Sequence, residues 1–114
     1  GATAGFDTKG KVILCEGYAT ALSVRAALKH AKMRYNIMVC FSAGNMTEIA
    51  SRYPDCFVIA DNDESGTGQR VAKKTGKPYW ISPVDGEDFN DFELRVGSRK
   101  AGESLIGVGL TVKP

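Results

Sequence analysis

The sequence has few of the residues that bind soft metals or form disulfides. Its 114 residues include three cysteines and one histidine, and no two cysteines have the Cys-x-x-Cys spacing of a zinc or redox site. A disulfide framework, a zinc or copper centre and a Ser-His-Asp hydrolase are therefore not indicated. We expect Cys15, Cys40 and Cys56 to be small buried hydrophobic residues of a cytoplasmic protein.

Long hydrophobic runs are also missing. No apolar run approaches the roughly 18–20 residues that a membrane span needs, and the N-terminus lacks the pattern of a signal peptide. With 43% hydrophobic and 25% charged residues, the chain is expected to form one compact domain with a modest core and no membrane partner. Because the first residue is Gly1, we expect a fragment of a larger protein.

A near-neutral net charge conceals an uneven distribution. The formal net charge is +2, but residues 55–93 contain nine acidic and four basic residues and carry −5, whereas the remainder carries +7. The sequence therefore predicts an acidic region that faces a cation and a basic remainder suited to an anionic partner.

Four short apolar runs alternate with helical patterns. The strands are predicted over residues 11–15, 37–41, 56–60 and 77–81, and the helices over about 19–32, 45–53, 67–75 and from 88 onward. Asn45 with Glu48 resembles a capping box, and Gly76 is placed to end the third helix. Continuously apolar strands indicate a parallel sheet covered on both faces. We therefore predict an α/β, Rossmann-like fold with about four mainly parallel strands, after a lead-in over residues 1–10.

Acidic residues follow the predicted strands. Glu16 follows the first strand, Asp61 and Asp63 follow the third, and Asp88 and Asp91 lie beyond the fourth. Ligands of open parallel sheets bind at the carboxyl ends of the strands. Carboxylates gathered there repel one another, and a hard cation such as Mg²⁺ relieves that cost.

The order strand-Glu-Gly, strand-Gly, strand-Asp-x-Asp-x-Ser-Gly resembles the TOPRIM domain of bacterial-type primases, type IA and II topoisomerases and some nucleases. The resemblance covers roughly residues 11–96, and we expect the domain to span 11–97, with 98–114 a C-terminal tail or the start of a further segment. Residues 16–23, together with Asp88-Phe89-Asn90-Asp91, are most similar to primases and primase-helicases of phages and conjugative plasmids. Topoisomerases of the family usually have a third aspartate where this chain has Ser65.

The resemblance implies a role for each matching residue. Glu16, Asp61 and Asp63 would be catalytic, Glu16 as a general acid/base or metal-associated group and the two aspartates as ligands of Mg²⁺, for which Mn²⁺ can substitute. Asp88 is a candidate further ligand and Asp91 a weaker one. The backbone is expected to turn near the site at Gly17, Gly44 and Gly66.

Basic residues recur at helical spacing on two predicted helices. They are expected to bind nucleic-acid phosphates, although a simple solvated helix face explains each stripe as well. The candidates are Arg25, Lys29 and Lys32 on the first helix and Arg70, Lys73 and Lys74, continued by Lys77, on the third.

These features predict a Mg²⁺-dependent nucleotidyl-transfer domain of a DNA primase or primase-helicase. Its partners would be a single-stranded DNA template, nucleoside triphosphates and a replicative helicase in cis or in trans. A metal-dependent nuclease, a topoisomerase module and a non-catalytic nucleic-acid-binding module are the alternatives. A phosphotransferase of the haloacid-dehalogenase kind fits less well, because there the Asp-x-Asp motif normally follows the first strand. Asp61, Asp63 and Asp88 could also be ordinary turn or helix-capping residues.

Overall fold

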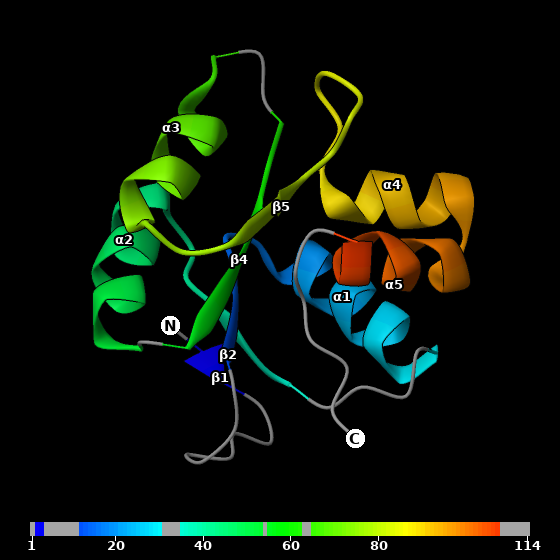
Figure 1. The fold of residues 1–114 in the computed structure, drawn as a ribbon, viewed down its shortest axis with the longest axis horizontal. Coiled ribbons are helices and arrows are strands. Elements are labelled where there is room, and N and C mark those ends of the chain that lie inside the picture. Colours follow the sequence, from blue (N-terminus) through cyan, green and yellow to red (C-terminus); the bar gives the residue numbers. More distant parts are fainter. Residues whose placement is uncertain (1, 4–11, 31–34, 54, 63–64, 108–114) are drawn as a thin grey trace.

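A computed structural model describes residues 2–3, 12–30, 35–53, 55–62 and 65–107 (Figure 1). From β2 onward, strands and helices alternate along the chain until two consecutive helices close the described part. The strands are β1 (Ala2–Thr3), β2 (Val12–Cys15), β3 (Asn36–Val39), β4 (Cys56–Ala60) and β5 (Tyr79–Ile81). The helices are α1 (Tyr18–His30), α2 (Ala43–Arg52), α3 (Thr67–Thr75), α4 (Phe89–Val96) and α5 (Ser98–Gly107).

The sheet has the strand order β1-β3-β2-β4-β5. Strands β2 to β5 are parallel to one another, and the two-residue β1 is antiparallel to β3 at the edge. The predicted α/β fold with a mainly parallel sheet is confirmed. Cys15 pairs with Val39 on one side and with Ile59 on the other. The residues that follow β2, β3 and β4 therefore meet at one edge of the sheet.

Helices cover both faces of the sheet, with α2 and α3 on one and α1, α4 and α5 on the other (Figure 1). Successive strand residues point to opposite faces. Accordingly, Ile13 packs in the cluster of α1, α4 and α5, whereas Leu14 packs in the cluster of α2 and α3. A continuous apolar strand is needed because both of its faces are buried.

Trp80 on β5 anchors the two C-terminal helices. Its ring centroid lies 4.9 Å from that of Phe89 and 5.1 Å from that of Phe92, and its indole Nε1 donates a hydrogen bond to Ser104 Oγ at 2.8 Å. The first part of the segment expected to be a tail is therefore α5, and its Leu105 is fully buried in the same core. Residues 108–114 lie outside the described residues.

Local sequence signals correctly place the end of α3 but misplace the start of α2. Helix α3 spans Thr67–Thr75 and ends at Gly76, as predicted. The predicted cap of α2 is wrong by three residues, because Ser42 is the N-cap and its Oγ accepts a hydrogen bond from Asn45 N. The Asn45 side chain instead donates to the carbonyl of Cys40.

The structure also describes the state of the cysteines and the length and apolarity of the helices. All three cysteines are free and buried, as predicted. Across the part of the chain that the structure describes, no helix combines the length and apolarity that a membrane crossing requires.

Candidate functional site

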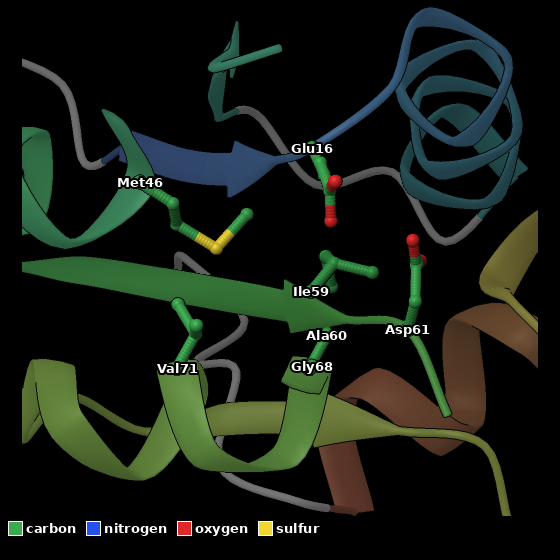
Figure 2. Close-up of a pocket in the computed structure, with 7 residues that line it drawn as sticks. All are labelled: Glu16, Met46, Ile59, Ala60, Asp61, Gly68 and Val71. Atoms are coloured by element: carbon green, nitrogen blue, oxygen red, sulfur yellow. The ribbon is translucent and has the colours of Figure 1, made fainter. Parts of the chain in front are cut away.

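Glu16 and Asp61 come together at the carboxyl edge of the sheet. Glu16 directly follows β2 and Asp61 directly follows β4, the neighbouring parallel strand. Both line one small pocket, and their carboxylates point into the same space between the two strand ends (Figure 2). The rest of the lining is apolar side chains and one glycine, contributed by Met46, Ile59, Ala60, Gly68 and Val71. Two acids thus face each other above a hydrophobic floor.

Thiols close to this edge stay protonated at neutral pH. Burial raises the pKa of Cys15 far above its ordinary value, and the nearby Cys40 and Asp61 raise it further. Burial likewise raises the pKa of Cys40 to about 11, with a smaller contribution in the same direction from Glu16. Cys15 and Cys40 are also fully buried, whereas Glu16 and Asp61 line the pocket, so the donors offered at this edge are the carboxylate oxygens.

These oxygens suit a hard divalent cation. Mg²⁺ is commonly bound by one or two carboxylates while it keeps several waters, and Glu16 with Asp61 supplies two. The described residues contain no group of three or more His, Cys, Asp or Glu side chains placed to hold a metal. Asp63, the second aspartate of the motif, lies outside the described residues, and its role stays a prediction.

Asp88 and Asp91 cap helix α4. Asp88 is the N-cap residue, and its Oδ1 accepts a hydrogen bond from Asp91 N at 2.8 Å. Asp91 Oδ2 accepts one from Asp88 N at 3.4 Å, which completes a capping box. Asp88 is therefore a helix-capping residue, which was one of the alternatives predicted for it. Metal binding by Asp88 or Asp91 stays a prediction.

Asn62, between the two aspartates of the motif, holds the site loop in place. It is buried, with 7% of its surface exposed. Its Nδ2 donates to the carbonyls of Ser82 at 2.8 Å and Val84 at 3.2 Å, and its Oδ1 accepts from Gln69 Nε2 at 2.7 Å. Its backbone carbonyl accepts from Gly86 N at 2.6 Å. Sequence reasoning missed this residue, because an asparagine between two acids looks like one more loop residue.

Glu87 belongs to the structural support of the site. It is 8% exposed, and it accepts hydrogen bonds from Arg95 Nε at 2.9 Å, from Arg95 Nη2 at 3.0 Å and from Ser82 Oγ at 2.6 Å. The hydrogen bonds from Arg95, and then the one from Ser82, lower the pKa of Glu87. Ser82 thus links this ion pair to Asn62, and the loop before α4 is tied to the loop after β4.

The glycines near the site differ in backbone conformation and in how closely other atoms pack against them. Gly66 is the N-cap of α3 with φ 74°, a conformation that L side chains rarely adopt. Gly68 packs directly on the backbone of Asp61, and sequence reasoning did not single it out. A Cβ atom added at Gly17 or Gly44 would come within 4 Å of no described residue beyond the local backbone.

The candidate phosphate-binding residues lie on opposite faces of the sheet. Arg25 and Lys29 are exposed on α1, whereas Lys73 and Lys74 are exposed on α3. Arg70, also on α3, donates hydrogen bonds to the carbonyl of Ser65 and to Thr67 Oγ1, and it thereby braces the turn before its own helix. Lys32 lies outside the described residues.

Residues 11–99 match a protein-family model described as the Toprim domain. The chain therefore belongs to the Toprim domain family, as the motifs indicated. Neither a search of curated proteins nor one of solved structures found a match. Membership implies a metal-dependent module that processes nucleic acid, since Toprim domains bind divalent metals, typically Mg²⁺.

Proposed function

We propose that this domain carries out the Mg²⁺-dependent nucleotidyl transfer of a DNA primase or primase-helicase. Its product would be an RNA primer, made from nucleoside triphosphates on single-stranded DNA. The observation that carries the proposal is the convergence of Glu16 and Asp61 at the ligand-binding edge of a Toprim domain. The similarity of residues 16–23 and 88–91 to primases supports this choice within the family.

The residues would divide the work between binding and proton transfer. Asp61 and Asp63 would hold the cation, with Asp88 as a candidate further ligand. A divalent ion bound there would neutralise charge on the reacting phosphates. Glu16 would accept the proton of the primer 3′-hydroxyl, or complete the metal site. The hydroxyl oxygen forms a new bond to the α-phosphorus of the incoming nucleotide, the bond from that phosphorus to the β-phosphate breaks, and pyrophosphate leaves.

The metal assignment is tested by titrating the protein with Mn²⁺ in a calorimeter. The double variant Asp61→Asn, Asp63→Asn should bind Mn²⁺ at least about tenfold more weakly than the unaltered chain, because it removes two charged oxygen ligands. Asp85→Asn is the matched control, since Asp85 is an exposed acid of the loop before α4. Undiminished binding by the double variant would refute the metal site.

The reaction is tested by two assays run side by side. With nucleoside triphosphates and a single-stranded DNA template, the domain should produce short RNA products, and Glu16→Gln should abolish them. Degradation of the template without synthesis would instead assign water as the nucleophile and make the domain a nuclease. Metal and DNA binding without either product would indicate the non-catalytic alternative.

A further inference from the structure

Two exposed aromatic residues flank Glu16 at the candidate site. Tyr18 is the first residue of α1, two residues after Glu16, and it is 65% exposed. Phe41 follows β3, its backbone N donates a hydrogen bond to the Glu16 carbonyl at 2.8 Å, and it is 62% exposed. We propose that Tyr18 and Phe41 form a surface on which bases of single-stranded DNA stack. The inference rests on the proposed function and identifies how its template is held.

Phe41 has a backbone conformation that bulky residues rarely adopt. Its φ is 66°, and among the described residues it is the sole non-glycine with a positive φ. A bulky side chain is a rare occupant of this region, where glycine or asparagine is favoured. Because the ring is exposed, Phe41 does not offset this cost by burial in the core. Strained residues of this kind cluster at functional sites, and this one is held by a hydrogen bond to Glu16.

Tyr18 begins a continuous exposed stripe on α1. Tyr18, Leu22, Arg25 and Lys29 are separated by four, three and four residues, so they lie along one helix face, and all four are exposed. The stripe is aromatic next to Glu16 and basic farther along the helix. Apolar and cationic groups are thus ordered along a line that starts at the site.

This combination fits one occupant, a single strand of DNA. Aromatic rings stack with unpaired bases whatever their sequence, and cations along the same track bind the phosphates. The carboxylates of Glu16 and Asp61 repel phosphates, so cations farther along the same track are needed to hold a polyanion near the site. Bases within a duplex are already stacked on one another and are not available to Tyr18 and Phe41.

Binding to labelled oligonucleotides in EDTA separates stacking from phosphate attraction. The probes are a twelve-nucleotide thymidine strand and an abasic strand with the same number of phosphates, followed by fluorescence anisotropy. Phe41→Gly and Tyr18→Ala should each weaken binding to the thymidine strand at least about fivefold, with little change for the abasic strand. Tyr18→Phe should bind normally because it keeps the ring. Leu94→Ala is the control, because it shortens another exposed apolar side chain, on α4.

Phe41→Gly also separates a binding role from a structural one. Because glycine adopts a positive φ without strain, this variant should melt at the same or a higher temperature while it loses DNA affinity. Unaltered affinity for the thymidine strand in both variants, equal losses on the two strands, or failure of the unaltered chain to bind the thymidine strand would overturn the proposal. Neither variant removes a carboxylate, so Mn²⁺ binding should persist. If the unaltered chain binds the thymidine strand as expected but does not bind Mn²⁺, the proposed catalysis is refuted and the stacking surface is not.

Discussion

Gly68 packs so closely on Asp61 that there is no space between them for a side chain. A Cβ atom at Gly68 would overlap the Asp61 carbonyl oxygen and lie 3.0 Å from its carbonyl carbon. Helix α3 is thereby in direct contact with the backbone that carries one of the two site carboxylates. Helix α3 can lie this close to the site only because residue 68 has no Cβ atom.

Gly68→Ala should disturb the protein and its metal site together. The added methyl group meets backbone rather than a flexible side chain, so either α3 or the Asp61 backbone must move. Overpacking of this kind costs about 1–3 kcal/mol in the free energy of unfolding, which urea denaturation measures. Mn²⁺ affinity should fall as well. Gly44→Ala serves as the comparison, because a Cβ atom at Gly44 would come within 4 Å of no described residue beyond the local helix backbone. Equal stability of the two variants would contradict the close packing.

Asn62→Ala should destabilise the loop beside the site. The change removes the donor to the Ser82 and Val84 carbonyls and the acceptor for Gln69. Buried polar groups left without partners make the expected loss about 2–3 kcal/mol of unfolding free energy. Gln69→Ala removes only one of these hydrogen bonds and should cost less. A chemical denaturation series on both variants checks the order, and a larger effect at Gln69 would contradict it.

The features that depend on local sequence patterns or on general topological rules could be predicted from the sequence. Helix α3 and its end at Gly76 follow from local periodicity and a glycine stop. The pairing of Glu16 with Asp61 follows from a topological rule, because the ends of adjacent parallel strands meet at one edge. Neither inference requires knowledge of a contact between distant side chains.

The remaining features depend on contacts that a single sequence does not reveal. The hydrogen bond from Asn62 to Ser82 joins residues twenty positions apart. Helix α5 follows Gly97 in a glycine-rich segment with weak local signals, and burial of Leu105 against the core stabilises it. The predicted cap of α2 is wrong because Ser42 and Asn45 are both good capping residues and lie within one turn of each other.

Glu87→Gln should lower thermal stability at neutral pH and matter little in acid. Hydrogen bonds from Arg95 and then Ser82 lower the pKa of Glu87 in the folded protein below its ordinary value of 4.5. A lowered folded-state pKa stabilises the protein above the ordinary value, and that stabilisation disappears as the pH falls through the folded value. Melting curves between pH 7 and pH 3 should therefore show the unaltered protein and the variant converging below about pH 4.5. Glu103→Gln, which removes an exposed i,i+4 ion pair with Arg99, should change little at any pH. A constant difference across the pH range would mean that the Glu87 charge is not the source of the stabilisation.

The exposed cations of α1 should determine much of the salt dependence of DNA binding. Arg25 and Lys29 lie on the stripe that begins at Tyr18, whereas Lys73 and Lys74 lie on α3, which covers the opposite face of the sheet (Figure 1). Each phosphate contact to a single strand contributes about 0.7 to the slope of log affinity against log salt concentration. Arg25→Gln with Lys29→Gln should therefore flatten that slope by about 1.4. The matched pair Lys73→Gln with Lys74→Gln makes the same charge change on the opposite face of the sheet, so it should flatten the slope less if the strand follows α1. Equal flattening by the two pairs would contradict a DNA path along α1, and a larger effect from the α3 pair would place the strand on the other face.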